Sequence, residues 1–269
     1  MNPLITVVVP CLNHGRYLDA ALQSVFEQNL PVEVMVADGG SADESVAILG
    51  HWSPKLKWWR SGTDSGQAWA INEGIRQGSA PYVCWLNADD IILPGGLLQL
   101  LDELVKNAQA PAAYGKCWTL NSVGEKTMPY LTTPFWSWLL ARYCFIAQPA
   151  TLIRRDAWEA VGGLDEKFHM CMDYDLWWRL HRYGGKFAYV REFVAGTRAH
   201  AETKTASKRK EHYLEAMQVV KRYTGHVPLK WILLWPIMVT ARAHIFAWRN
   251  KYAKTVEFNK SKTDMESKH

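Results

Sequence analysis

The sequence of 269 residues contains 48% hydrophobic and 21% charged residues, a balance that excludes a disordered or fibrous chain. Its length predicts one α/β-type domain with an appendage. The formal net charge of +5 is unevenly spread, because residues 1–197 carry −4 and residues 198–269 carry +9. A basic tail of this kind is typical of chains that bind nucleic acid or an anionic membrane.

Strands and helices are expected to alternate in the first half of the chain. The apolar, β-branched run at residues 4–9 predicts a central strand that is buried on both faces. Helices are predicted over residues 18–26, 43–49, 66–78 and 97–105, and further strands over residues 32–37, 55–60 and 82–86. This order predicts an open, mostly parallel sheet with helices on both faces.

The second half has a less regular pattern. Helices are predicted over residues 154–161, 173–183 and 208–223, and strands over residues 112–120 and 186–194. Between them lies an aromatic segment, residues 133–144. There is no internal repeat and no low-complexity linker.

Polar side chains follow each of the first four predicted strands. Asn13, Asp38 and Asp64 follow strands one to three, and Asp89 and Asp90 follow the fourth. Ligands of such sheets bind outside the carboxyl ends of the strands. Asn and Asp are ordinary turn residues at any single position, but four such ends together predict one shared cleft.

Two acidic groups have both a chemical and a structural interpretation. Adjacent carboxylates at Asp89 and Asp90 repel each other unless a cation is bound, which favours a metal site over a simple turn. Asp173 begins a predicted helix, where it is either a capping residue or a general base. His200 is a candidate third metal ligand, since imidazole with carboxylates suits Mn²⁺ and tolerates Mg²⁺.

Several other classes of protein are not supported by motifs. The chain has no GxxxxGK[ST], GxGxxG or GxSxG motif. Its five scattered cysteines form no CxxC pair, which argues against a zinc site or a disulfide framework. With an odd cysteine count and no signal peptide at the start, we expect a cytoplasmic location.

Seven motifs in order resemble those of glycosyltransferase family 2, over roughly residues 4–205. They are Thr6–Asn13, Val36–Asp43, Asp64–Gln67 with Asn72–Ile75, Leu86–Asp90, Gln148–Thr151, Val161–Asp165 and Met172–Arg179. The resemblance implies a GT-A fold and inverting transfer of a sugar from a nucleotide diphosphate sugar. We expect the transfer to be non-processive, because the sequence has neither a Gln-x-x-Arg-Trp motif nor a set of membrane spans. The resemblance also implies a domain over residues 1–205, with a nucleotide-binding half (1–110) and an acceptor-binding half (111–205), followed by a helical tail (206–269).

The resemblance assigns roles to individual positions. Asp38 matches a residue that binds the nucleobase, and Asp64 matches another carboxylate on the nucleotide side. The remaining nucleotide-side positions are Pro10, Asn13, Asn87 and Asp90. Asn87 replaces the first acid of a DxD motif, which lowers the charge available to a metal.

The same resemblance implies the metal and catalytic groups. Asp89 and His200 match ligands of a divalent metal, Mn²⁺ or Mg²⁺. Asp173 matches the catalytic base. The positions expected near the donor sugar or the acceptor are Gln148, Trp177 and Arg179.

The tail suggests where the enzyme works. The apolar stretch at residues 231–241 is too short to span a membrane. Tryptophans with basic residues suit the surface of an anionic membrane, although packing on the body or in a dimer is the alternative; the side chains concerned are Trp231, Trp235, Trp248, Lys230, Arg242 and Arg249. We therefore expect a polyprenyl-diphosphate-linked glycan acceptor, surface polysaccharide biosynthesis, and a peripheral location at the inner face of the cell membrane.

Other functions remain open at this point. A UDP-sugar donor is favoured, with GDP- or dTDP-sugars possible. A nucleotide-sugar hydrolase or a nucleotidyltransferase would use the same cleft. A nucleic-acid-binding protein would use the basic tail, but residues 204–210 contain no aromatic side chains for base stacking. The sequence does not determine the oligomeric state.

Overall fold

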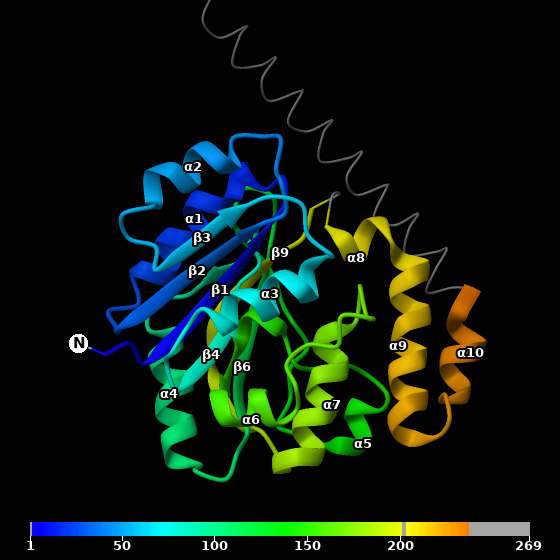
Figure 1. Ribbon diagram of the computed structural model, residues 1–269. Coiled ribbons are helices and arrows are strands. Elements are labelled where there is room, and N and C mark those ends of the chain that lie inside the picture. Colours follow the sequence, from blue (N-terminus) through cyan, green and yellow to red (C-terminus); the bar gives the residue numbers. More distant parts are fainter. Residues whose placement is uncertain (1, 201–202, 237–269) are drawn as a thin grey trace, which may run out of the picture. The chain divides into compact units, whose positions relative to one another are not determined.

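The computed structural model describes residues 2–200 and 203–236 (Figure 1). The chain divides into two units. The first unit is Met1–Ala199, and the second begins at His200. Each unit is described here by itself. The domain boundary expected after residue 205 stays a prediction.

The first unit alternates strands and helices along its first half. The strands are β1 (Ile5–Cys11), β2 (Val32–Asp38), β3 (Trp58–Ser61), β4 (Tyr82–Trp85) and β5 (Ile91–Ile92). The helices are α1 (Gly15–Phe26), α2 (Ser45–Trp52), α3 (Gln67–Arg76) and α4 (Gly96–Lys106). Every strand and helix that the pattern of apolar residues predicts in this half is present.

The second half of the unit has more elements than the sequence predicts. Its strands are β6 (Ala112–Leu120), β7 (Lys126–Pro129), β8 (Thr151–Arg154) and β9 (Ala188–Arg198). Its helices are α5 (Ser137–Leu140), the 3₁₀ helix η1 (Gln148–Ala150), α6 (Arg155–Ala160) and α7 (Met172–Gly184). The sequence predicts β6, β9, α6 and α7, whereas β7, β8, α5 and η1 are additional.

The strands of the described chain form one mixed sheet in the order β3-β2-β1-β4-β8-β6-β9-β5, with β7 beside β6. The pairs β1–β2, β1–β4, β2–β3 and β6–β9 are parallel. The pairs β4–β8, β6–β8, β5–β9 and β6–β7 are antiparallel. The parallel pairs predominate in length, as expected, while β8 inserts antiparallel between β4 and β6 and β5 pairs antiparallel with β9.

Helices cover both faces of this sheet, as predicted (Figure 1). Val7 and Val9 of β1 share a buried cluster with apolar residues of α1, α2 and α4. Val8 faces the opposite side, where α3 comes so close that a Cβ at Gly74 would lie 2.5 Å from the Val8 Cγ1. Alternation along one buried strand thus supplies two cores, one for each layer of helices.

The second core contains a group of tryptophans. Trp85 of β4 stacks on Trp177 of α7 with ring centroids 5.9 Å apart, and it meets Trp158 of α6 edge-on at 6.1 Å. Trp85 and Trp177 are fully buried. Aromatic burial of this size anchors α6 and α7 to the sheet.

The second unit contains α8 (Lys204–Ser207), α9 (Arg209–Thr224) and α10 (Leu229–Pro236). Tyr213 of α9 packs against Trp231 and Trp235 of α10, with ring centroids 5.7 and 5.2 Å apart. No helix among the described residues has the length and apolar character needed to cross a membrane. Trp248, Arg242 and Arg249 lie outside the described residues.

Candidate active site

The loops that follow β1 and β2 are joined by hydrogen bonds around Asp38. The Asn13 N–H donates to the Ser41 hydroxyl at 2.7 Å, and the Asn13 Oδ1 accepts from the Ala42 N–H at 2.8 Å. The Ser41 hydroxyl in turn donates to Asp38, the last residue of β2. Asn13 and Asp38, which are 25 positions apart in the sequence, therefore lie in one connected loop cluster.

Asp38 is held as an anion by its donors. Its Oδ2 accepts from the Ser61 hydroxyl at 2.6 Å and from the backbone N–H groups of Gly40 and Ser41 at 3.1 and 2.9 Å. Burial raises the pKa of Asp38, but the hydroxyls of Ser41 and Ser61 and the two N–H groups outweigh it and lower the pKa. In this arrangement the carboxylate shapes the loop beside the predicted nucleobase site.

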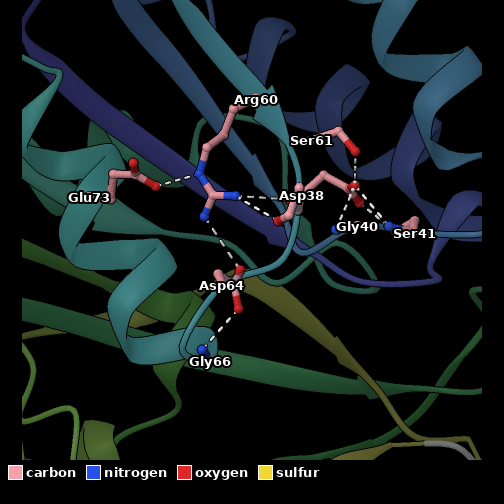
Figure 2. Close-up of polar contacts among 9 residues, drawn as sticks. Asp38, Gly40, Ser41, Arg60, Ser61, Asp64, Gly66 and Glu73 are labelled. Atoms are coloured by element: carbon pink, nitrogen blue, oxygen red, sulfur yellow. Dashed lines mark hydrogen bonds and ion pairs between the residues drawn. The ribbon is translucent and has the colours of Figure 1, made fainter.

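Arg60 links three acidic residues: Asp38 at the end of β2, Asp64 after β3 and Glu73 in α3 (Figure 2). Its Nε lies 2.5 Å from the Glu73 Oε2, and its Nη2 lies 3.5 Å from the Asp64 Oδ2. Its Nη1 donates to the Asp38 backbone carbonyl at 3.2 Å. The guanidinium also lies 4.7 Å from the centre of the Trp69 ring. Because Arg60 contacts all these groups, it holds α3 and the loop after β3 against the end of β2.

Asp64 lies over the Asp38 loop. A Cβ at Gly39 would come within 3.3 Å of the Asp64 Oδ2, so the absence of a side chain there permits this approach. The Asp64 Oδ1 accepts from the Gly66 N–H at 2.9 Å, just before α3. Asp64 is therefore positioned from both sides, by Arg60 and by the start of α3.

Asp89 and His14 form a candidate metal site. Ligand atoms of the two side chains lie within 4.8 Å of one another, and Asp89 is only 9% exposed. A carboxylate with a neutral imidazole is a donor set that suits Mn²⁺ and tolerates Mg²⁺. His14 directly follows Asn13, so this pair adjoins the Asp38 loop cluster. The residues present thus fit a divalent cation.

Asp90, beside Asp89, points into the protein. Its Oδ1 accepts from the Arg198 N–H at 2.8 Å, and its Oδ2 accepts from the Asn87 Nδ2 at 3.2 Å. Burial, followed by the charge of Asp89, raises the pKa of Asp90 to about 8. The expectation that Asp90 contacts the nucleotide is not supported by this geometry, because its side chain is 2% exposed and already engaged.

Asp173 lies at the first turn of α7, and its Oδ1 accepts from the Tyr174 N–H at 2.8 Å. Burial raises the pKa of the Cys144 thiol well above its usual value, and the negative charge of Asp173 adds to that shift. The Tyr174 hydroxyl bonds the Leu140 carbonyl of α5. The aromatic segment that the sequence analysis singled out therefore packs beside Asp173, which remains partly exposed.

Trp177 and Arg179, two of the three residues expected near the sugars, pack against or bond to other residues of the protein. Trp177 is fully buried against Trp85, so its indole has no route to an acceptor in this structure. The Arg179 Nε lies 2.7 Å from the Asp175 Oδ2, and its Nη1 donates to the carbonyls of Val161 and Gly163. Arg179 holds the Gly162-Gly163 turn onto α7, which explains why these residue types occur together.

The remaining predicted positions are placed as follows. Pro10 is buried within β1 opposite Ala37, so it supports the strand rather than facing a ligand. Gln148 begins η1 and bonds to Asn87 at 3.2 Å, next to the candidate metal site. His200 is buried and comes two residues after β9 ends at Arg198. It is the first residue of the second unit.

Sequence reasoning missed three residues at this site: His14, Arg60 and Gln67. His14 stands at the start of α1, where a lone histidine resembles a helix boundary residue. Arg60 lies inside β3, and its partner Glu73 is 13 residues away in the sequence. Only the structure shows that the two side chains form an ion pair. Gln67 donates from its Nε2 to the Asn87 Oδ1 at 2.8 Å. It belongs to the Asp64–Gln67 motif, but it has no acidic or nucleophilic group that would mark it in the sequence.

Comparison with known proteins gives the family of the chain. The family model described as Glycosyl transferase family 2 matches residues 6–162. Chondroitin synthase of Escherichia coli is 23% identical over 210 residues, which cover 77% of this chain and 30% of the synthase. The chain spans less than a third of the length of this and the next similar curated relatives, a hyaluronan synthase and a second chondroitin synthase from Pasteurella multocida.

Solved structures give the fold. S. aureus TarS in complex with UDP-GlcNAc superimposes with a TM-score of 0.65 at 15% identity, covering 82% of this chain and 66% of that chain. Mannosyltransferase PcManGT from Pyrobaculum calidifontis, in complex with GDP-Man and Mn²⁺, superimposes with a TM-score of 0.62 at 17% identity, covering 91% of this chain and 70% of that chain. The chain therefore belongs to glycosyltransferase family 2 and has the GT-A fold.

Proposed function

We propose that this chain catalyses the inverting, metal-dependent and non-processive transfer of one sugar from a nucleotide diphosphate sugar to a hydroxyl group of a glycan acceptor. One observation carries the proposal. Ligand atoms of Asp89 and His14 lie within 4.8 Å of each other. From Asn13, the residue before His14, hydrogen bonds lead to the Asp38 loop, and Arg60 joins this loop to Asp64. These groups follow the carboxyl ends of neighbouring parallel strands, where ligands of α/β sheets bind, which supports a metal site and a nucleotide site there.

A UDP-sugar is the favoured donor, with GDP- and dTDP-sugars as alternatives. TarS and PcManGT share the fold and bind UDP-GlcNAc and GDP-Man respectively. In our proposal the base binds beside Asn13, Asp38 and Asp64. The diphosphate is bound toward Asp89, with Asn87 next to it.

The cation is proposed to bind Asp89 and His14. That His200 is a further ligand stays a prediction of the family resemblance. A divalent cation bound here would stabilise the negative charge that develops on the leaving diphosphate. Mn²⁺ is favoured over Mg²⁺ because the set includes an imidazole.

Asp173 is proposed as the general base. Its carboxylate accepts the proton of the acceptor hydroxyl while that oxygen attacks the anomeric carbon. The bond from that carbon to the diphosphate oxygen breaks on the opposite side, which inverts the anomeric configuration. Gln148 remains the candidate for contact with the donor sugar.

The acceptor is proposed to be a polyprenyl-diphosphate-linked glycan in surface polysaccharide biosynthesis, reached by a peripheral enzyme at the inner face of the membrane. Three apolar side chains of α10 support a membrane-facing role, because Leu229, Ile232 and Leu233 are 68%, 55% and 68% exposed. Trp231 and Trp235 pack on Tyr213, so the leucines and the isoleucine, rather than the tryptophans, are the exposed group in the described part of the tail.

The donor is tested by thermal denaturation of the full chain with UDP-, GDP- and dTDP-sugars in Mn²⁺. We expect one class, UDP-sugars first, to raise Tm, and EDTA to abolish the increase. Anomeric ¹H NMR of the product then gives the stereochemistry. No shift with any donor, or a product that retains the donor configuration, would contradict the proposal. Release of free sugar with every glycan acceptor offered would point to a hydrolase.

The membrane role is tested by flotation with anionic phosphatidylglycerol vesicles. Leu229→Ser with Leu233→Ser should reduce flotation of the full chain. Val105→Ser, on α4 and 62% exposed, is the matched control and should leave flotation unchanged. Equal flotation of the tail variant and the wild type would remove α10 from membrane binding.

A further inference from the structure

Three side-chain amides from separate segments are hydrogen-bonded in a row beside Asp89. Gln67 is the first residue of α3, Asn87 follows β4, and Gln148 is the first residue of η1. The Gln67 Nε2 donates to the Asn87 Oδ1 at 2.8 Å, and the Asn87 Nδ2 donates to the Gln148 Oε1 at 3.2 Å. We call Gln67, Asn87 and Gln148 the amide relay.

The orientation of every amide in the relay follows from one backbone group. The Trp85 carbonyl can only accept, so the group of Gln148 that lies 2.7 Å from it must be Nε2. That choice turns the Gln148 Oε1 toward Asn87, which must then donate with Nδ2. The same Nδ2 lies 3.2 Å from the Asp90 Oδ2, another acceptor. The Asn87 Oδ1 is thereby left to accept from Gln67.

A carboxylate at position 87 would not fit this arrangement. It has no hydrogen to donate, so one of its oxygens would face the Gln148 Oε1, which also can only accept. An ionised carboxylate beside the buried Asp90 would in addition lose solvation. The amide at position 87 therefore provides a donor that an acid at this position would lack.

We propose that the amide relay positions Asp89 and that Asn87 is required for this purpose. Asn87 and Asp90 flank Asp89 in the chain, and the relay holds one while the Arg198 N–H holds the other at 2.8 Å. The Arg198 Nε also donates to the Asp89 carbonyl at 2.8 Å. Replacing Asn87 by the acid of the DxD motif should thus weaken the site, although it adds a negative charge. This inference rests on the proposed function only where it takes Asp89 as a metal ligand.

The central test is a double-mutant cycle of Asn87→Asp and Asp90→Asn. Asn87→Asp removes the donor to the Gln148 Oε1, and Asp90→Asn places two amide donors against each other. The double variant exchanges the roles, because the new amide at position 90 can donate to the new acid while still accepting from the Arg198 N–H. We expect each single variant to lose about 10- to 100-fold in Mn²⁺ affinity, the range for loss of a supporting hydrogen bond. The double variant should recover part of that loss.

The measurements are calorimetric titration with Mn²⁺ alone and thermal denaturation in EDTA. The melt in EDTA reports the relay without metal or nucleotide sugar, so a failure of the relay and a failure of the proposed function are distinguishable. Unchanged Tm and equal or tighter Mn²⁺ binding by Asn87→Asp would overturn the proposal. So would a double variant no better than the worse single variant.

Gln67→Glu provides a second, milder variant should Asn87→Asp not fold. It keeps the shape of the side chain but removes the donor to the Asn87 Oδ1, so Mn²⁺ affinity should fall. Gln77→Glu, the same change at the exposed end of α3, is the matched control and should have no effect. Equal Mn²⁺ affinity in the Gln67 and Gln77 variants would contradict the relay.

Discussion

The two halves of the first unit contribute to the candidate site in different ways. In residues 1–110, the polar groups stand in loops at the carboxyl ends of parallel strands, and hydrogen bonds connect them directly. In residues 111–199, Asp173 stands at a helix start beside a packed aromatic segment. The comparison suggests a division of labour, in which the first half binds the donor and the second half holds the base for the acceptor.

The largest effect that tests this division is expected for Asp173→Asn. Loss of a general base should reduce the transfer rate by about 10²- to 10⁴-fold, while the KM for the donor stays near its wild-type value. Steady-state kinetics with the donor identified in the thermal screen measure both quantities.

The matched control is Asp156→Asn at the first turn of α6. Its Oδ1 accepts from the following N–H at 2.7 Å, just as the Asp173 Oδ1 accepts from the Tyr174 N–H. If Asp173 were only a capping residue, the two variants would lose similar, small amounts of activity through stability alone.

The second effect concerns folding rather than chemistry. Trp177→Ala should lower the free energy of unfolding by about 3–5 kcal/mol, because it removes a fully buried indole that stacks on Trp85. Trp138→Ala, on α5 and 57% exposed, should change it by less than about 0.5 kcal/mol. Urea denaturation measures both. A fully stable Trp177→Ala with a raised KM for the acceptor would restore Trp177 to the sugar side.

The sequence also predicts the fold of the first half better than that of the second half. Residues 4–9 and the helical periodicity from Leu18 onward are local signals, and β1 and α1 form there as predicted. β8 has only four residues, and its place between β4 and β6 depends on pairing with strands far away in the chain. Such long-range pairing leaves little trace in local periodicity.

The prediction of the candidate site from the sequence has the same limit. The prediction that Asp38 and Asn13 share a cleft depends only on strand ends, and the two loops are joined in the structure. The roles assigned to Asp89, Asp173 and His200 stay predictions. The positions of Trp177 and Arg179 in the motif say nothing about which way their side chains face, and the structure turns both toward the scaffold.

A third, smaller effect tests whether His14, in the first half, binds the metal. His14→Ala should weaken Mn²⁺ binding by at least about tenfold, with little effect on Tm in EDTA, since His14 is partly exposed. His51→Ala, on an exposed position of α2, is the control. Titration with Mn²⁺ measures both variants, and equal affinity would remove His14 from the site.

The smallest effect is the pH dependence of Asp38. Its pKa in the folded state is lowered, so its ionised form contributes stability above its ordinary pKa of about 4, and this contribution is lost as the pH falls through the folded pKa. The Tm difference between wild type and Asp38→Asn should therefore be largest near pH 7 and narrow toward about pH 3. A difference that is constant over this range would contradict the role of the Ser41 and Ser61 hydrogen bonds.

The division of labour itself is tested most directly by calorimetric titration of the donor nucleotide sugar, in Mn²⁺, into two variants side by side. We expect Asp89→Ala to weaken donor binding by at least about tenfold and Asp173→Asn to bind the donor as the wild type does. Equal binding by both variants, or a larger loss in Asp173→Asn than in Asp89→Ala, would contradict the assignment of donor binding to the first half and of the base to the second.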